Sequence, residues 1–348
     1  MPAGDAEMGC RPDFGEVYTA GAVLGAGAFG QVRIGTDKAT EQHVAIKSML
    51  KVRGQLTREK TLAKIAREMG FMQRMQGQPC VVCMVGCFED QDSVHMVTEL
   101  CTGGDLRKYV ETHGVLEEDT LAVVALQTLR FIRACHKNGI VYGDVKPANL
   151  VLPVPAPPAG EPFRIRAIDF GTSQPLADPT KRLKRRAGTF SFMAPEVFER
   201  NYGPPADMWS LGVMLYWLFS YRFPFWKTGS VPSSSGVEDI ANAVSTFPVR
   251  FDYGPWLSIS PEGLDFISRC MQRNEGSRLT TRQGLEHPWL VKAAATLEAI
   301  GGDGSATLGD SEDDLECEPC GDVSWDSPTA LPLPVNTLLK DAPEEEAN

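Results

Sequence analysis

The sequence lacks any segment that could cross a membrane or direct export. Its longest apolar run, Leu211–Phe219, falls well short of the roughly 20 residues that a transmembrane helix needs. Residues 1–16 contain acidic side chains and no apolar core, so they do not resemble a signal peptide. Pro2 excludes the N-myristoylation pattern. We therefore expect a cytoplasmic or nuclear protein that does not bind membranes.

The nine cysteines are scattered along the chain and form no complete metal-binding pattern. Their odd number in a chain without an export signal predicts reduced thiols. Cys80, Cys83 and Cys87 lie in a stretch that predicts a buried strand and its approach, so we interpret them as small buried residues. Cys317 and Cys320 form an isolated CxxC, whereas a closed zinc site needs four ligands.

A basic stripe is also missing, so nucleic-acid binding is not expected. Residues 291–348 hold 14 acidic and 2 basic side chains, whereas residues 1–290 hold 31 and 32. The excess negative charge therefore belongs to the C-terminal segment, which contains one aromatic residue beyond about Ala295. Because such a segment buries too little apolar surface to offset its ordering entropy, we expect residues 291–348 to form an acidic, disordered tail.

Hydrophobic periodicity divides the rest into a sheet-rich part and a larger helical part. Residues 18–50 alternate as three strands with turns between them, and 83–88 and 94–100 predict two more. Apolar residues recur at helical spacing over 56–75 and again over 121–135, where Asn138–Gly139 predicts a helix stop. The proline-rich residues 153–162 predict a surface loop.

A glycine-rich segment, Leu24-Gly-Ala-Gly-Ala-Phe-Gly-Gln-Val32, lies between the first two predicted strands. Gly25, Gly27 and Gly30 form a GxGxxG, which lets a backbone approach phosphate oxygens closely. In a dinucleotide-binding fold the third glycine opens a helix, and a plain tight turn is a further alternative. The strand-like alternation from Gln31 favours a hairpin flap over phosphates.

A lysine and a glutamate predict the phosphate-binding partners of this flap. In Val44-Ala-Ile-Lys47, strand alternation places Ala45 and Lys47 on one face, which suits an adenine ring with phosphates beyond it. Glu68 lies on the apolar face of the following helix, where an unpaired carboxylate is costly. We expect Glu68 to pair with Lys47, although it could also lie at the rim of the apolar stripe.

Four further motifs follow in order. They are Tyr142-Gly-Asp-Val-Lys-Pro-Ala-Asn149, Ile168-Asp-Phe-Gly171, Met193-Ala-Pro-Glu196 and Asp207-Met-Trp-Ser-Leu-Gly-Val213 with Arg278. Together with the glycine loop, this set resembles the eukaryotic protein kinases over about residues 18–290. The resemblance implies an α+β, two-lobed kinase fold with a small antiparallel sheet, one helix and a larger helical lobe. It further implies an N-terminal extension (1–17), a small lobe of about 18–99 and a large lobe of about 102–290.

The resemblance also implies a role for each motif residue. Asp144 would accept or orient the proton of a substrate hydroxyl, Lys146 would neutralise the transferring phosphoryl group, and Lys47 and Glu68 would complete the catalytic set. Asn149 and Asp169 would bind Mg²⁺ through oxygen atoms. The nucleotide ATP would lie against residues of the glycine loop, the strands and the segment after them: Leu24, Gly25, Ala26, Gly27, Ala28, Phe29, Gly30, Val32, Ala45, Lys47, Glu99, Cys101, Asp105 and Val151.

Other matches are structural. Glu196 and Arg278 would form a buried ion pair, Asp207 would hold the catalytic loop, and Tyr142 would stack with Phe170 and with two methionines, Met72 and Met84. Lys146, together with Thr189, resembles the serine/threonine branch of the family. We therefore expect phosphorylation of protein serine or threonine. The alternative is a pseudokinase that binds ATP and acts as a scaffold, and a dinucleotide-binding oxidoreductase is disfavoured by the strand after the glycine loop.

The sequence departs from the family at two places. Tyr142-Gly143-Asp144 replaces His-Arg-Asp, and the missing arginine normally pairs with an activation-loop phosphate, so we expect activity without that phosphate. The basic run Lys181-Arg-Leu-Lys-Arg-Arg186 lies in the activation segment. It is either a solvated loop, a dock for acidic substrates, or a dock for the acidic stretch Asp310–Glu318.

The larger lobe is most similar to the calcium/calmodulin-dependent and calcium-dependent kinases. The similarity rests on Trp209–Ser220, Phe223-Pro-Phe-Trp226 and Glu286-His-Pro-Trp-Leu290. No DxDxDG loop ending in glutamate is present in the sequence, so EF-hands are not expected. The segment after Leu290 is not a basic amphipathic helix, and we therefore expect no calmodulin binding there.

Overall fold

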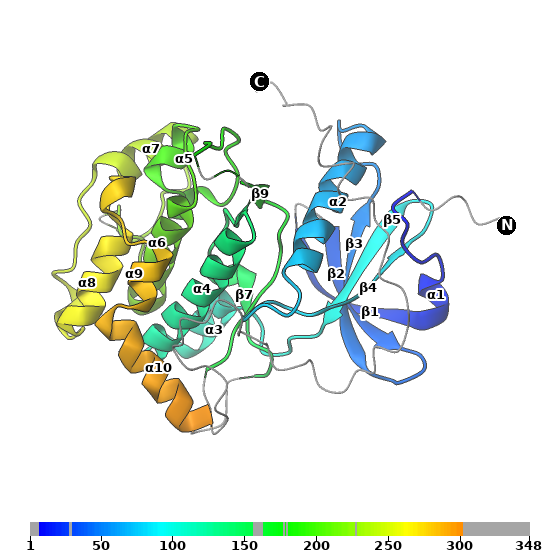
Figure 1. Cartoon of the computed structure of the whole chain (residues 1–348), viewed down its shortest axis with the longest axis horizontal. Coiled ribbons are helices and arrows are strands. Elements are labelled where there is room, and N and C mark those ends of the chain that lie inside the picture. The colour runs from blue at the N-terminus through cyan, green and yellow to red at the C-terminus, as the bar shows by residue number, and fades with distance from the viewer. Residues whose placement is uncertain are drawn as a thin grey trace. The chain divides into compact units, whose positions relative to one another are not determined.

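The computed structural model describes residues 7–27, 30–155, 163–176, 178, 180–226 and 228–301. These residues form two compact units (Figure 1), each taken by itself below. The described part of the first unit covers residues 7–77 and 82–101, and that of the second covers 78–81 and 102–301. The expected fold class is confirmed, because the first unit is a five-stranded antiparallel sheet with one long helix and the second is mainly helical.

The sheet of the first unit has the strand order β1-β2-β3-β5-β4, with every neighbouring pair antiparallel. Each strand pairs with the next one along the chain, as short turns between antiparallel strands allow, except β3, which pairs with β5 instead of β4. The elements of this unit are α1 (Phe14–Val17), β1 (Tyr18–Gly27), β2 (Gly30–Asp37), β3 (His43–Leu50), α2 (Arg58–Arg74), β4 (Met84–Glu89) and β5 (Ser93–Glu99).

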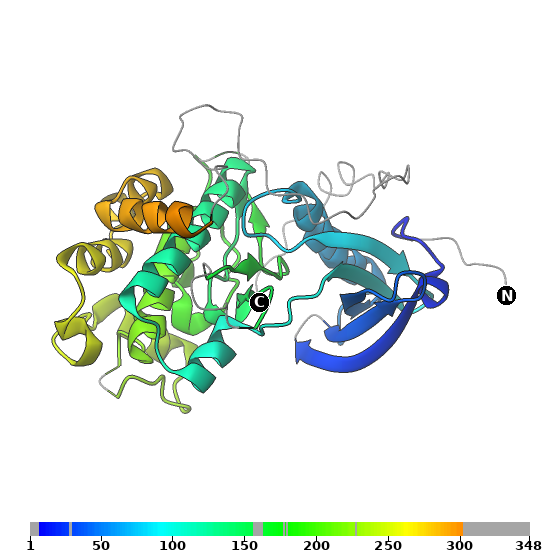
Figure 2. The same cartoon turned by 90° about the horizontal axis from the view of Figure 1, so that it is seen from below.

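Helix α2 lies alongside this sheet (Figures 1 and 2). It begins after Thr57, whose hydroxyl accepts a hydrogen bond from the backbone N–H of Lys60, as a helix cap does. Its apolar face is buried, and Met69 reaches Cys87 of β4 with a sulfur–sulfur distance of 3.9 Å. The helix thereby presents Glu68, one residue earlier, to the sheet.

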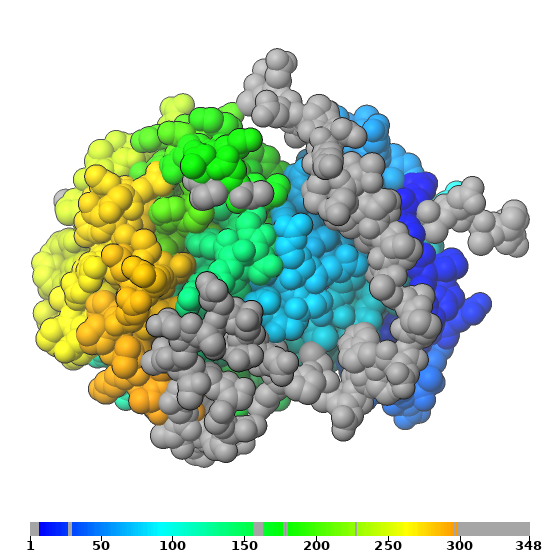
Figure 3. Space-filling model, in the orientation of Figure 1, coloured from blue at the N-terminus to red at the C-terminus, as the bar shows by residue number. Residues whose placement is uncertain are grey.

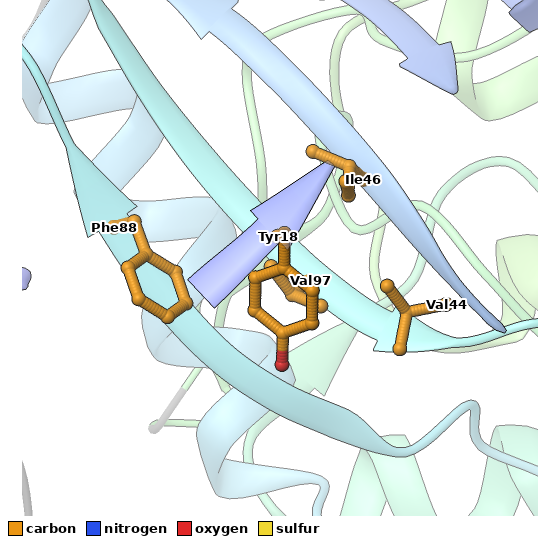
Figure 4. Packing of buried hydrophobic residues seen from close by; sticks show 5 residues of the cluster. All are labelled: Tyr18, Val44, Ile46, Phe88 and Val97. Carbon is orange, nitrogen blue, oxygen red and sulfur yellow. The ribbon is translucent and has the colours of Figure 1, made fainter. Parts of the chain in front are cut away.

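One face of the sheet packs a small aromatic and aliphatic core (Figure 4). The rings of Tyr18 and Phe88 meet edge to face at 5.5 Å, which is a favoured aromatic geometry. Phe14 of α1, which is itself partly buried, packs against this cluster. The buried members are Tyr18, Val44, Ile46, Phe88 and Val97. Since side chains alternate along β3, this packing assigns Lys47 to the opposite face.

The N-terminal segment is held on β4 by a disulfide bond between Cys10 and Cys87. The backbone N–H groups of Met8 and Cys10 also donate to Oε1 of Glu89, at 3.0 and 3.2 Å. Glu89 forms a buried ion pair of 2.7 Å with Lys51. The expectation of reduced thiols is therefore wrong for this pair, because the fold brings together two cysteines that lie 77 residues apart.

The second unit is built around two long buried helices, α4 and α6, which contact each other. Helix α4 ends where predicted, with Asn138 as its cap and Gly139 at a positive φ. The helices are α3 (Leu106–His113), α4 (Glu118–Lys137), α5 (Pro195–Phe198), α6 (Pro205–Ser220), α7 (Val237–Thr246), α8 (Pro261–Cys270), α9 (Thr281–Leu285) and α10 (Pro288–Gly301). The short strands are β6 (Ile140–Val141), β7 (Leu150–Val151), β8 (Arg166–Ala167) and β9 (Gln174–Pro175), and the 3₁₀ turns are η1 (Pro147–Asn149), η2 (Phe190–Phe192), η3 (Gly254–Leu257) and η4 (Glu275–Ser277).

Helix α10 corrects the expected start of the acidic tail. The helix crosses the boundary placed at residue 290 and continues to Gly301, running beside α4 (Figure 2). Ala293 and Ala294 are buried, and small side chains allow this close helix packing. The predicted disorder is therefore wrong for residues 291–301, and the rest of the tail lies outside the described residues. Within the residues that the structure describes, no helix is both long and apolar enough to span a bilayer.

Candidate active site

The glycine-rich segment forms the tip of a β hairpin in the first unit. Strand β1 reaches Gly27 and β2 starts at Gly30, with Gly25 paired to Val32 across the hairpin. Gly30 has φ of +143°, and a Cβ there would lie 2.2 Å from the carbonyl oxygen of Ser48, so only glycine fits. The strand that follows the glycines excludes the helix of a dinucleotide-binding fold. Ala28 and Phe29, two of the predicted nucleotide contacts, lie outside the described residues.

Lys47 and Glu68 form the predicted ion pair, with 2.5 Å between Nζ and Oε1. The Glu68 side chain is 3% exposed and that of Lys47 is 14% exposed. A carboxylate this buried is tolerated because a cation neutralises it, and loss of either partner would leave a buried charge. The pair therefore fixes the lysine ammonium at the face of the sheet that α2 covers. The contact is confirmed, while its role in nucleotide binding stays a prediction.

The other predicted nucleotide contacts of the first unit lie on the sheet or just after it. Leu24 is 42% exposed on β1, and Ala45 of β3 pairs with Thr98 of β5. The Glu99 carboxylate accepts a hydrogen bond of 2.7 Å from the backbone N–H of Cys83. The backbone N–H of Glu99 in turn donates to the carbonyl of Cys83 at 2.9 Å, and the predicted contact of Glu99 with the nucleotide stays a prediction. Cys101 is the last residue of the unit.

Asp144 is the centre of a polar cluster in the second unit. Its Oδ2 accepts from Lys146 Nζ at 2.7 Å and from Asn149 Nδ2 at 3.1 Å, and its Oδ1 accepts from the backbone N–H of Thr189 at 2.8 Å. Lys146 Nζ also donates to the Thr189 hydroxyl at 2.8 Å. Asp144 is 6% exposed, so these donors replace most of the water that a carboxylate needs. The structure therefore brings together four residues that the sequence places in two distant motifs.

The predicted catalytic loop, residues 142–149, is anchored by Asp207 at the start of α6. Its two carboxylate oxygens accept the backbone N–H groups of Tyr142, at 3.0 Å, and Gly143, at 2.8 Å. His136 of α4 contacts the same carboxylate at 2.9 Å, a partner that the sequence analysis missed. Gly143 has φ of +78°, a conformation that side chains rarely adopt. Gly143, which occupies the position of the family's arginine, is thus held only through its backbone.

Three aromatic rings support the loop from within. Tyr142 packs edge to face against Phe170 at 5.4 Å and against Phe131 at 4.9 Å, and its hydroxyl donates to the carbonyl of Ile168 at 2.7 Å. Burial, reinforced by the negative charges of Asp169 and Asp144, raises the pKa of Tyr142 well above its usual range. The predicted stacking of Tyr142 on Phe170 is confirmed. The predicted stacking of Met72 and Met84, which belong to the first unit, stays a prediction.

The two predicted metal ligands suit a hard cation. Asn149 directs its amide nitrogen to Asp144, which leaves the amide oxygen as the atom able to ligate a cation. Asp169 adopts φ of +65°, and its Oδ1 accepts from the N–H of Gly171 at 3.0 Å. Amide and carboxylate oxygens are the donors that Mg²⁺ prefers. The donor set therefore fits magnesium chemically.

Asp105 and Val151 are neighbours in the second unit, joined by an isolated β bridge. The Asp105 carboxylate caps α3, accepting from the backbone N–H of Lys108 at 2.9 Å. Val151 is buried on β7. The capping role is sufficient to explain an acidic residue at this position, so the contact of Asp105 with the nucleotide stays a prediction.

Glu196 and Arg278 form the predicted buried ion pair. Arg278 donates to both carboxylate oxygens, at 2.6 and 3.1 Å, in a bidentate arrangement. It also donates to the carbonyls of Gln272 and Pro205 at 2.9 and 2.8 Å, and stacks over Trp209 at 5.3 Å. The pair joins residues 82 positions apart and connects α5, which contains Glu196, to the segment before α9.

The activation segment has anchors that the sequence analysis missed. The backbone carbonyl of Arg185 accepts from the Tyr202 hydroxyl at 2.7 Å and from Gln174 Nε2 at 3.0 Å. Arg182 pairs with Glu275 and donates to the carbonyl of Asn201 at 2.6 Å. Burial raises the pKa of Tyr202 to about 12, so its hydroxyl remains a donor at neutral pH. These contacts are long-range, and no local pattern in the sequence signals them.

Comparisons with known proteins agree with this geometry. The family model described as "Protein kinase domain" matches residues 18–290. Among curated proteins, the chain is 36% identical over 273 residues to "Calcium-dependent protein kinase 17" of Arabidopsis thaliana, covering 78% of this chain and 49% of that protein. It is 35% identical over 280 residues to "Calcium-dependent protein kinase 12" of Oryza sativa subsp. japonica, covering 80% and 50%.

The chain spans about half the length of these curated relatives, so the comparison concerns their kinase domains. The matched range contains every predicted site residue, including the Asp144 cluster and the Lys47–Glu68 pair. The expected resemblance to the calcium-dependent group is confirmed at this level. The chain therefore belongs to the protein kinase family.

Proposed function

We propose that this protein transfers the γ-phosphoryl group of ATP to serine or threonine hydroxyls of protein substrates. The observation that carries the proposal is the Asp144 cluster. Its carboxylate is buried and held by three donors, one of which is the Lys146 ammonium, and Asn149 and Asp169 in the same unit suit Mg²⁺. Phosphoryl transfer relies on positioning and charge neutralisation, which this cluster is built to supply.

Each residue of the site has a separate role in the proposed reaction. A carboxylate oxygen of Asp144 orients the substrate hydroxyl and receives its proton as the hydroxyl oxygen bonds to the γ-phosphorus. The bond from that phosphorus to the bridging oxygen breaks, and ADP leaves. The Lys146 ammonium, 2.7 Å from Asp144 Oδ2, neutralises charge on the transferring group. When bound, Mg·ATP supplies the phosphoryl group and the charge neutralisation of the metal. Asn149 and Asp169 would hold that metal, and Lys47 would bind the phosphates, with Glu68 fixing the position of the lysine.

Serine and threonine specificity follows from Lys146 and Thr189. The Thr189 hydroxyl and the Asp144 carboxylate are both bound to Lys146, which favours a short aliphatic hydroxyl next to them. In the family this lysine accompanies serine/threonine specificity. The intact Lys47, Glu68 and Asp144 disfavour the pseudokinase alternative, since each of them retains its partner.

A phosphate-transfer assay tests the proposal. The full-length chain is incubated with Mg²⁺, γ-labelled ATP and a general protein substrate, in parallel with Asp144→Asn and Lys47→Met. We expect incorporation into serine and threonine, reduced at least about 100-fold in both variants because each removes a group that acts on the phosphoryl. Nucleotide binding without incorporation in the unaltered chain would refute kinase activity and support a scaffold.

A calcium chelator added to the same assay tests a second part of the proposal. The sequence of this chain contains no EF-hand loop, so we propose that its activity does not respond to calcium. The expected result is an equal rate with and without chelator at constant Mg²⁺. Stimulation by calcium would contradict it.

A further inference from the structure

Three cations of the activation segment have no carboxylate partner among the residues that the structure describes. They are Lys184, Arg185 and Arg186, and we call them the basic surface. Lys184 contacts the amide oxygen of Asn201 at 3.2 Å, and Arg185 the carbonyl of Thr172 at 3.5 Å. The other two cations of the run each have a carboxylate nearby. Arg182 pairs with Glu275, and the charge of Lys181 helps to lower the pKa of Asp178, so both cations are left out of the basic surface.

The charges of the basic surface are accessible. Lys184 and Arg185 are exposed, and half-buried Arg186 lies over the ring of Phe190, 5.6 Å from its centroid. Figure 3 shows this part of the chain, in green, at the surface of the face drawn. Since neutral oxygens and a ring are their only contacts in the described residues, three positive charges remain available to an anion.

The backbone that carries these cations is fixed. Tyr202 and Gln174 both donate to the carbonyl of Arg185, and Leu183 forms a β bridge with Tyr202. A fixed backbone lowers the entropy cost of presenting long side chains to a partner. The arrangement therefore differs from a solvated loop in which each charge moves independently.

The basic surface is adjacent to the catalytic carboxylate. Gly188 packs so tightly on the carbonyl of Gly143 that a Cβ there would approach it to 2.2 Å, and the next N–H, of Thr189, donates to Asp144. Arg186 is three residues before Thr189, a backbone span of at most about 10 Å. In a substrate whose hydroxyl is bound at Asp144, a residue two or three positions from the phosphorylated one lies within about the same distance of Asp144.

We propose that Lys184, Arg185 and Arg186 select protein substrates that carry aspartate or glutamate within a few residues of the phosphorylated serine or threonine. The inference rests on the proposed kinase function and adds the substrate class. Clusters of arginine and lysine recognise acidic motifs through charge-assisted hydrogen bonds. The same positive charges repel basic substrates, so the basic surface both attracts acidic substrates and disfavours basic ones.

The test compares three peptides with the full-length chain. Each has one central serine, and the flanking positions within three residues are alanine, aspartate or lysine. We expect kcat/KM for the aspartate peptide to exceed that for the alanine peptide by about tenfold and that for the lysine peptide by more, mainly through KM. Raising the salt concentration should shrink the difference, because exposed charges are screened.

Two variants link this preference to the basic surface. Lys184→Gln with Arg185→Gln should lower kcat/KM for the aspartate peptide to the level of the alanine peptide, with the alanine peptide unaffected. Lys184→Glu with Arg185→Glu should reverse the order and favour lysine, a gain that misfolding cannot produce. The matched control, Lys137→Gln with Arg282→Gln, removes two exposed cations elsewhere in the unit and should keep the full preference.

The outcomes separate this inference from the proposed function. Transfer to all three peptides at equal efficiency, or a preference for lysine in the unaltered chain, would overturn the acidic specificity and leave the kinase function standing. A preference for aspartate that survives both variants would also overturn the role of the basic surface. Absence of transfer to any peptide or protein would refute the kinase function, and this inference with it.

Discussion

At the residue scale, Gly143 decides how the catalytic loop is held. It occupies the position where the family carries an arginine, and its backbone, not its side chain, makes the contact that matters. Asp207 accepts the backbone N–H groups of Tyr142 and Gly143, and neither contact involves the activation segment. The backbone that leads to Asp144 is therefore held by a contact within the folded core of the unit, while the Asp144 carboxylate also accepts the N–H of Thr189.

Gly143 leads to a prediction about regulation. Because no arginine is present to bind an activation-loop phosphate, we expect phosphatase-treated enzyme to retain at least about half of its activity. The measurement is the initial rate of peptide phosphorylation before and after treatment, with removal of phosphate checked by mass spectrometry. Near-complete loss of activity, restored by autophosphorylation, would show that a phosphate is required despite Gly143.

Some single residues indicate their structural role in the sequence alone, and others do not. Glu68 was recognisable because a carboxylate on an apolar helix face needs a partner, and Lys47 was the cation available. Gln174 and Tyr202 gave no such signal. Each is an ordinary polar residue until the fold directs it to the carbonyl of Arg185, so only the structure identifies it as an anchor.

At the element scale, the N-terminal segment adds an unexpected layer to the first unit. Residues 8–11 run along the edge strand β4, where Arg11 bridges to Phe88 and donates its N–H to the carbonyl of Cys87 at 3.2 Å. An edge strand presents unpaired backbone groups, and covering them stabilises the sheet. The disulfide between Cys10 and Cys87 makes this cover covalent.

Reduction of this disulfide should destabilise the first unit. A cross-link between residues 77 positions apart restricts the unfolded chain, which is worth about 2–4 kcal/mol. We expect a lower urea midpoint for the chain after reduction, measured by fluorescence. The Cys10→Ser variant is the control, because its midpoint should already be low and should not respond to reductant. Ready alkylation of Cys10 and Cys87 in unreduced protein would contradict the pairing.

Helix α10 shows the limit of reading an element from composition. The expected tail begins after Leu290, where the family motifs end, although residues 291–300 contain mainly Ala, Val, Leu and Ile. Packing against α4 and α8 buries Ala293 and Ala294 and stabilises the helix through tertiary contacts. The end of the folded part was therefore misplaced from the sequence by about one helix.

At the scale of the whole molecule, charge is distributed unevenly along the chain. Residues 291–348 carry 14 acidic and 2 basic side chains, and the remainder is almost balanced. The basic surface is one place within the balanced part where positive charge is left without a carboxylate partner among the described residues. Substrates and the chain's own acidic stretch, residues 310–318, are therefore competing candidates for it.

Truncation after Gly301 distinguishes the two candidates. All described elements remain in such a chain, so we expect the same kcat/KM for the aspartate peptide within about twofold. The peptide assay at low salt provides the measurement, with thermal unfolding as a check that the truncated chain folds. A KM several-fold lower after truncation would show that the acidic segment occupies the basic surface in the intact chain.

The order of motifs along the chain was enough to determine the family, the sheet-then-helix organisation and the residues of the candidate site. These properties are visible in sequence because glycine conformation, strand alternation and helical spacing are local. Only the tertiary structure decided the Cys10–Cys87 bond, the extent of α10 and the anchors beneath Arg185. Each depends on contacts between residues far apart in the chain, and folding alone brings such residues together.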